Sequence, residues 1–225
     1  MQFSDLHVGP TIKGPFVESV VQSIEGLNAD LIVFTGDLVD GSVADLKEDV
    51  APLSRLNAPF GKYFITGNHE YYSGVLPWIE KAKDLGFKVL IDAHDLLTKE
   101  GATLTLAGVT DYSSTQFVKD HKSDPLKAVS GAPNDSIKIL LAHQPANIYK
   151  AVEAGYDLQL SGHTHGGQFI PWNFVTRLSQ PYIAGMSRHQ DTWIYVNRGT
   201  GYWGPPLRLG ISSEITIITL IQGEA

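Results

Sequence analysis

Five short polar clusters contain the residue types that bind metal ions in proteins. Each follows an apolar run, and together they hold five of the eight histidines, in the order Asp5-Leu6-His7, Gly36-Asp37-Leu38-Val39-Asp40, Gly67-Asn68-His69-Glu70, Ala142-His143 and Gly162-His163-Thr164-His165. Imidazole and carboxylate together suit manganese, iron, zinc, cobalt or nickel, whereas magnesium and calcium prefer oxygen ligands alone. The chain contains no cysteine, so any metal site would use only nitrogen and oxygen.

The spacing within the clusters also suits metal binding. The Asp-x-His and His-x-His tripeptides place alternate side chains on one side of a strand or its exit loop, so both members can reach one ion. The clusters offer more ligands than one tetrahedral site needs, and two ions sharing a carboxylate would use them. Alone, an Asp-x-His often marks a solvated turn, and a Gly-Asp-x-x-Asp could be a turn followed by a helix cap. All five clusters in this order favour a dinuclear site.

The pattern of apolar residues predicts the elements that would position these clusters. Short apolar runs predict strands at residues 30–36, 63–66, 137–142, 158–160, 192–196 and 214–220. Helical spacing of apolar residues predicts helices at 16–27, 43–56, 76–85 and 145–154. Residues 88–109 have the pattern of short strands joined by turns. Alternating strands and helices indicate an α/β or mixed sandwich, whose strand ends would bring the polar clusters to one edge.

Composition excludes several classes of protein. A formal net charge of −7 argues against binding to a nucleic acid duplex through a positive surface. A hydrophobic content of 43% argues against a disordered chain, and apolar stretches of about four residues are far too short to span a membrane. No internal repeat or linker is evident, which predicts a single domain over residues 1–225. Because only Phe3 is clearly apolar before the first cluster, we expect a natural precursor that continues upstream; a native short start is the alternative.

The ordered clusters resemble the calcineurin-like metallophosphoesterase superfamily over residues 5–165. The later segments Gly166-Gly167-Gln168 and Asn197-Arg198-Gly199-Thr200-Gly201 are similar to a bacterial membrane-associated branch, which includes phosphodiesterases and lipid-linked sugar-nucleotide pyrophosphatases. The resemblance implies a four-layer αββα sandwich, in which two mixed β-sheets pack together and helices cover their outer faces.

The resemblance also implies a role for each cluster. Two divalent metal ions would be bound, the first by Asp5, His7, Asp37 and His165 and the second by Asp37, Asn68, His143 and His163. Asp37 would bridge the ions, His69 would be the catalytic imidazole, and Asp40 would orient it. Manganese is the expected metal, with zinc, iron or cobalt as alternatives. Two such ions would make hydroxide available near neutral pH, and His69 would donate a proton to the leaving group.

Two departures from one branch of the superfamily bear on the substrate. Protein Ser/Thr phosphatases carry arginine at the positions of Gly41 and Thr66, and arginine binds phosphate monoesters through paired hydrogen bonds. Their absence favours a phosphodiester or pyrophosphate substrate over a monoester. Arg198 and Arg188 are candidates for contacting a distal phosphate, although both could equally be solvated surface residues.

Large apolar residues surround the clusters in the sequence. They follow the last cluster from Phe169 to Val175, with Trp172 as a candidate substrate contact, and occur also at Tyr71, Tyr72, Trp78, Tyr202 and Trp203. At the rim of the site they would suit an acyl chain, a nucleobase or a membrane surface; core packing is the alternative for each. The sequence therefore predicts a metal-dependent phosphoesterase for a small, nucleotide-sugar or lipid-linked substrate, with peripheral contact at a bacterial membrane. A phosphomonoesterase or a catalytically silent binding module of the same fold are the alternatives.

Overall fold

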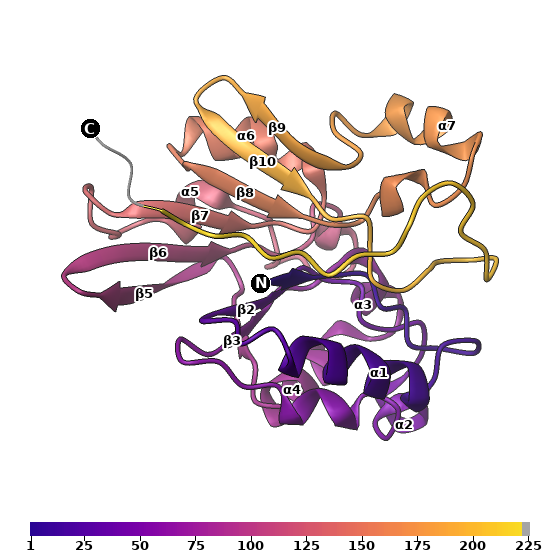
Figure 1. Cartoon of the computed structure of the whole chain (residues 1–225). Helices are drawn as coiled ribbons and strands as arrows, with labels where there is room; N and C mark the ends of the chain where they lie inside the picture. Colours follow the sequence, from indigo (N-terminus) through magenta and orange to yellow (C-terminus); the bar gives the residue numbers. More distant parts are fainter. Residues whose placement is uncertain (222–225) are drawn as a thin grey trace.

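The computed structural model describes residues 1–221, whose strands form two β-sheets (Figure 1). The first sheet is parallel throughout and has the order β1-β2-β3-β4, with strands at Gln2–Phe3, Ile32–Phe34, Lys62–Phe64 and Lys88–Val89. The second sheet is mixed and has the order β5-β6-β7-β8-β10-β9, with strands at Ala93–Lys99, Ala102–Gly108, Ile137–Leu141, Leu158–Ser161, Thr192–Val196 and Gly185–His189.

Helices cover the outer faces of both sheets, and one further helix lies at the edge of the molecule. They are α1 (Gly14–Glu25), α2 (Val43–Leu46), α3 (Asn68–Tyr72), α4 (Val75–Asp84), α5 (Pro125–Ala128), α6 (Ile148–Glu153) and α7 (Trp172–Ser179), with short 3₁₀ turns at Ala51–Arg55, Ser114–Gln116, Pro145–Asn147 and His165–Gly167. Helix α1 begins with Pro15 in its first turn, where a missing N–H breaks no hydrogen bond, and buries Val17, Val21 and Ile24 on one face. Among residues 1–221, no helix has both the length and the hydrophobicity needed to cross a membrane.

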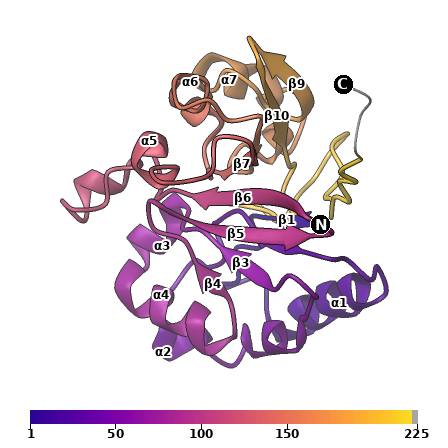
Figure 2. The same cartoon turned by 90° about the vertical axis from the view of Figure 1, so that its left-hand side faces the viewer.

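Three layers of buried apolar side chains hold these elements together. One lies between the first sheet and its helices and includes Trp78, the second lies between the two sheets and includes Leu141, and the third packs Ile148 of α6 against Ile194 of the second sheet. Each large side chain that is fully buried contributes about 1.5–3 kcal/mol. The order helix, sheet, sheet, helix confirms the predicted four-layer αββα sandwich, although the first sheet is parallel and only the second is mixed as predicted (Figures 1 and 2).

Two predicted elements differ in the structure. The helix expected at 43–56 is divided into α2 and a 3₁₀ turn, because Pro52 has no N–H to continue an α-helix. The strand expected at 214–220 is reduced to one bridge, in which Gln2 and Thr216 exchange backbone hydrogen bonds of 2.8 Å. Its partner β1 is only two residues long, so no ladder can extend. The 88–109 segment is shared between the sheets: β4 joins the first, and the β5–β6 hairpin joins the second.

The carboxyl ends of the central strands of both sheets meet at one edge of the sandwich. In Figure 1 the arrowheads of β7, β8 and β10 point towards the side on which α7 lies. The chain leaving β1 hydrogen-bonds the chain leaving β2, with Asp5 N donating to Gly36 O at 3.0 Å, and Gly162 N after β8 donates to His143 O after β7 at the same distance. The fold thus brings the five polar clusters together.

Candidate metal centre

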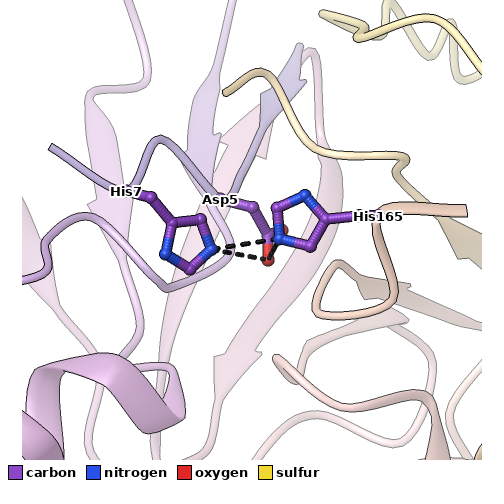
Figure 3. Close-up of side chains that lie close together, drawn as sticks. All are labelled: Asp5, His7 and His165. Carbon is purple, nitrogen blue, oxygen red and sulfur yellow. Dashed lines mark hydrogen bonds and ion pairs between the residues drawn. The ribbon is translucent and has the colours of Figure 1, made fainter. Parts of the chain in front are cut away.

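The first group of candidate ligands comes from the loops after β1 and β8. Asp5, His7 and His165 offer ligand atoms that all lie within 4.8 Å of one another (Figure 3). The two Nε2 atoms of His7 and His165 are 3.0 Å apart, and His165 Nε2 lies 3.4 Å from Asp5 Oδ1. All three side chains are almost fully buried. The geometry suits one ion bound by two imidazoles and a carboxylate.

A second group lies beside the first and shares a carboxylate with it. His143 Nε2 lies 3.1 Å from Asp37 Oδ2, 3.2 Å from Asn68 Oδ1 and 3.3 Å from His163 Nδ1. The same oxygen of Asp37 lies 3.7 Å from His7 Nε2 of the first group. The Asp37 carboxylate therefore lies between the two groups, where it could contact two ions at once.

Two of the candidate histidine ligands are held in place by hydrogen bonds from Nδ1, the ring nitrogen that faces away from the site. Nδ1–H of His143 donates to the carbonyl of Thr35 at 2.7 Å, and Nδ1 of His7 lies 3.2 Å from the Asp40 carboxylate. These acceptors hold each ring through Nδ1 and leave Nε2 turned inward, as in histidines that bind metals. The inward atoms of both groups are therefore the nitrogen and oxygen types that bind a cation.

Burial and neighbouring charges give the site residues different pKa values. Burial, and then neighbouring His143, lowers the pKa of His163 to about 4. Burial, and then His7 and Arg208, holds the pKa of His165 well below its ordinary value. Both imidazoles are thus neutral near pH 7, which is the form that binds metals. Although burial alone would raise it, the pKa of Asp37 lies well below its ordinary value because His143 faces the carboxylate, so Asp37 is ionised.

The backbone at the candidate ligands is strained. Five of the seven have a positive φ, which costs a non-glycine residue about 1 kcal/mol or more: Asp5 (53°), His7 (52°), Asp37 (58°), His163 (71°) and His165 (51°). Such residues persist where the surrounding structure holds them, and they concentrate at functional sites. Holding these side chains inward therefore lowers the stability of the fold.

Two glycines let the ligand loops approach one another closely. A Cβ atom at Gly67 would overlap the carboxylate of Asp37, and one at Gly162 would overlap the side chains of Ser4 and Asp5. The space occupied by the two carboxylates thus exists only because neither position carries a side chain.

His69 lies next to the candidate ligands and is paired with Asp40. Nδ1 of His69 is 2.5 Å from Asp40 Oδ1, while its backbone N–H donates to Asp37 Oδ1 at 2.9 Å. Although burial alone would lower it, the pKa of His69 is raised by the hydrogen bond to Asp40 and by the nearby Asp37. Asp40 also contacts Nδ1 of His7, so one carboxylate orients both imidazoles.

A cavity of about 400 Å³ opens above these residues. Its floor includes His7, Asp37, Asn68 and His69, and its wall includes Phe169 and Trp172, whose rings stack with centroids 6.4 Å apart. The structure therefore places the predicted substrate contact Trp172 at the cavity.

The other predicted contacts lie elsewhere. Arg198 is exposed beside Glu214, and Arg188 lies on β9 beside Asp191; neither lines the cavity. Trp78 and Tyr71 are buried, so they pack in the interior rather than at the rim, in agreement with the alternative of core packing. Tyr72 and Trp203 are about half exposed, and their rings lie 5.2 and 6.3 Å from the ring of His69.

Three polar residues support the site although sequence reasoning assigned them no role. Gln168 lines the cavity and holds Trp203 by accepting from its N–H at 2.8 Å and donating to its carbonyl at 2.6 Å. Arg208 donates to several carbonyls between residues 198 and 201 and lies 3.2 Å from Nδ1 of His165. No local pattern identifies these two, since Gln168 pairs with Trp203 and Arg208 lies beside His165, both more than thirty residues away.

Glu70 is the third, and it joins two ligand loops. Its buried carboxylate accepts from the backbone N–H groups of Asp37 (3.0 Å), Leu38 (2.6 Å) and Gly67 (2.6 Å). Burial, and then the charge of Asp37, raises the pKa of Glu70 to about 7. Its position three residues after Gly67 matches a helix capping box, which is the signal that could have identified it.

Glu70→Ala should lower the melting temperature by about 10 °C, because three buried N–H groups lose their acceptor at about 1 kcal/mol or more each. Thermal unfolding followed by circular dichroism measures the change. The matched control is Glu80→Ala on α4, whose side chain is exposed and paired with Lys83. Equal melting temperatures for the two variants would show that Glu70 does not hold the loops.

Comparisons with known proteins agree with this geometry. The family model for the calcineurin-like phosphoesterases matches residues 1–167. A Danio rerio protein named "transmembrane protein with metallophosphoesterase domain" is 37% identical over 227 residues, covering 97% of this chain and 52% of that protein. An uncharacterized metallophosphoesterase of Helicobacter pylori is 36% identical over 220 residues, covering 97% of this chain and 58% of that protein. This chain therefore spans little more than half the length of these relatives.

A solved structure has the same fold. The calcineurin-like phosphoesterase YfkN from Bacillus subtilis matches with a TM-score of 0.52 at 15% identity, over 86% of each chain. Since the family model covers most of the sequence and the relatives match it nearly end to end, this chain belongs to the calcineurin-like phosphoesterase family.

Proposed function

We propose that this chain is a metal-dependent phosphodiesterase or pyrophosphatase whose substrate carries an apolar group, such as a nucleotide-sugar or lipid-linked phosphate ester. One observation carries the proposal: Asp37 lies between two groups of metal-binding atoms at the floor of a cavity that also contains His69. Membership of the family implies phosphoester hydrolysis, and the type of ester is our inference from the cavity.

The two groups would hold the two divalent ions that calcineurin-like phosphoesterases use. Asp5, His7, Asp37 and His165 would bind one, and Asp37, Asn68, His143 and His163 the other. When bound, the ions supply positive charge to the phosphoryl group and lower the pKa of water. The mixed nitrogen and oxygen donors suit manganese, with zinc, iron or cobalt as alternatives.

His69 would handle the proton of the leaving group. The hydrogen bond from Nδ1–H to Asp40 fixes the ring and favours the charged imidazolium, which leaves Nε2–H free to donate. His69 lines the cavity beside Asn68, so a leaving-group oxygen bound there lies within its reach. Transfer of this proton would neutralise the alkoxide or phosphate as the bond to phosphorus breaks.

The lining of the cavity supports a diester or pyrophosphate. Within residues 1–221, no lysine or arginine lines it, and the positions of the phosphatase arginines hold Gly41 and Thr66. A dianionic monoester would therefore find little positive charge beyond the metal ions. The apolar rings of Phe169, Trp172 and Trp203 instead offer area to an apolar substituent.

We further propose that residues 1–225 act as one domain at the periphery of a bacterial membrane. Similarity to a protein named for its transmembrane character supports membrane association.

A substrate panel tests the proposed reaction. We expect kcat/KM for a bis(aryl) phosphate to exceed that for the matching aryl phosphate by about tenfold or more in the presence of manganese, because the monoester lacks cationic partners. Nucleotide-sugar pyrophosphates and phospholipids extend the panel, and zinc, iron and cobalt are compared in parallel. A preference for the monoester would reverse the assignment, and absence of hydrolysis with every metal and ester would indicate a binding module.

Trp172→Ala should raise KM for a long-chain diester by about tenfold, since the ring would bury apolar area worth about 25 cal/mol per Å² against the chain. Steady-state kinetics with long-chain and short-chain diesters measure the effect, and kcat should change little. The matched control is Trp193→Ala, because Trp193 is similarly exposed on β10 but outside the cavity. If the wild-type KM does not depend on chain length, and Trp172→Ala leaves KM unchanged for both diesters, Trp172 does not contact substrate.

A further inference from the structure

Gln180 follows the last residue of helix α7 and lines the cavity together with that helix. The helix has no buried residue and lies at the edge of the molecule in Figure 1. At its carboxyl end, Nε2 of Gln180 donates to Oε1 of Gln144 at 3.3 Å, and Oε1 of Gln180 accepts from the backbone N–H of Ala146 at 3.2 Å. Because Gln144 directly follows the candidate ligand His143, Gln180 joins the α7 wall of the cavity to the loop after β7.

A buried carboxylate fixes the direction of these hydrogen bonds. Asp111 is fully buried and accepts from Nε2 of Gln144 at 3.0 and 3.2 Å and from the backbone N–H of Ser113 at 2.8 Å. An ionised carboxylate only accepts, so the NH₂ group of Gln144 faces Asp111 and its Oε1 faces Gln180. A backbone N–H only donates, so Oε1 of Gln180 faces Ala146 and its NH₂ group faces Gln144. We call Asp111, Gln144 and Gln180 the amide relay, and it gives the Gln180 amide a single orientation.

The relay leaves one hydrogen of this amide unused. An NH₂ group carries two hydrogens, and among residues 1–221 that of Gln180 has one acceptor, Oε1 of Gln144. The two hydroxyl groups that α7 contributes to the cavity use their hydrogens within the helix. Thr176 donates to the carbonyl of Trp172 at 3.3 Å, and Ser179 donates to the carbonyl of Thr176 at 3.0 Å. Of these three polar side chains, Gln180 therefore retains a donor for a molecule in the cavity.

We propose that Gln180 is a specificity-determining residue, which donates a hydrogen bond to a carbonyl or phosphoryl oxygen on the substituent that the reacting phosphorus carries. Within residues 1–221, no lysine or arginine lines the cavity, so a neutral amide is the donor that the α7 wall offers to such an oxygen. A site built to hydrogen-bond one group discriminates against a ligand that lacks it, because the donor is then left unpaired. Asp111 and Gln144 are positioning residues that act through Gln180. The inference rests on the proposed function for the reaction itself.

Titration calorimetry of the manganese-loaded protein tests the contact without turnover. Thymidine 5′-monophosphate carries carbonyl oxygens beyond its phosphate, and phenyl phosphate carries none. We expect Gln180→Leu to weaken binding of the nucleotide by about fivefold or more and to leave phenyl phosphate unaffected. Gln180→Glu should weaken it further, since a carboxylate has no hydrogen to donate. Gln144→Leu should weaken it with metal content unchanged, because Gln180 loses the acceptor that orients it. The matched control is Gln22→Leu, which changes an exposed glutamine of α1 and should bind as wild type.

Kinetics with two diesters separate this inference from the proposed function. Thymidine 5′-(4-nitrophenyl phosphate) and 4-nitrophenyl phenyl phosphate release the same nitrophenolate, and Gln180→Leu should raise KM for the first alone, with kcat unchanged. If wild type hydrolyses neither, the proposed function fails, whereas the calorimetric loss would still support the contact.

Three results would overturn the inference. Wild type that binds thymidine 5′-monophosphate no more tightly than phenyl phosphate, or Gln180→Leu that binds the nucleotide as tightly as wild type, would exclude the contact. An equal loss for both ligands would show that Gln180 only holds the α7 wall in place. Gln144→Leu that binds the nucleotide as wild type would show that the relay does not position the amide.

Discussion

Asp37→Ala should remove both metal ions and lower turnover by about 10³-fold or more, a larger loss of bound metal than any other single substitution causes. Oδ2 of Asp37 lies 3.1 Å from Nε2 of His143 and 3.7 Å from Nε2 of His7, so this one oxygen faces ligand nitrogens of both groups. Removing one carboxylate therefore weakens two sites, and it leaves the imidazoles facing one another without a negative charge between them.

Metal content per chain after dialysis, measured by mass spectrometry, is the direct readout. Asp37→Asn is the conservative companion, because asparagine tolerates the positive φ of this position and can still accept from His69 N–H. It should retain the fold and still lose metal, which separates an effect of charge from one of unfolding. His94→Ala is the control, since His94 hydrogen-bonds the carbonyl of Ala128 outside the site. An Asp37→Ala protein that retains two ions per chain would disprove the bridging role.

The position of the metal centre could be predicted from sequence because its signals are local. The polar clusters after the first follow the apolar runs of predicted strands, and parallel strands bring the loops at their carboxyl ends to one edge of a sheet. Asp37 and His143 follow strands of different sheets, so their meeting also depends on the packing of the two sheets, which the family resemblance implied. The roles of the seven ligands stay predictions. The prediction of a single domain over residues 1–225 likewise stays a prediction.

Features that depend on tertiary contacts could not be predicted in the same way. Helix α7 has no buried residue, so contacts with the core do not identify it as a helix. Its large apolar residues were therefore interpreted as part of the rim of the site, and no helix was predicted there. The strand expected at 214–220 has the correct pattern, but its partner β1 is only two residues long. Glu70 is adjacent to a predicted catalytic residue, yet its role depends on N–H groups of Asp37 and Leu38, more than thirty residues away.

His69→Ala should lower kcat by about 10²–10⁴-fold while both metal ions remain bound, the range expected when a general acid is removed. His7, Asp37 and His69 also offer ligand atoms that lie within 4.8 Å of one another, but Nδ1 of His69 is occupied by Asp40, and we assign the ring to proton transfer. The loss should depend on the leaving group, because an alkyl alcohol needs a proton as it departs and a nitrophenol hardly does. A loss equal for both esters, or loss of metal with the imidazole, would exclude the proposed role.

Asp40→Asn should differ from His69→Ala in a way that tests the arrangement of the site. Asp40 contacts Nδ1 of His69 at 2.5 Å and Nδ1 of His7 at 3.2 Å. The substitution therefore disturbs both the proposed catalytic imidazole and a candidate metal ligand. We expect it to reduce kcat by about 10-fold or more and also to weaken metal binding, because the carboxylate that orients a histidine ligand contributes about 10–100-fold to affinity. Titration of metal into the two variants measures the difference. If Asp40→Asn binds metal as tightly as His69→Ala does, Asp40 orients only the catalytic imidazole, and the contact with His7 has no part in holding the ion.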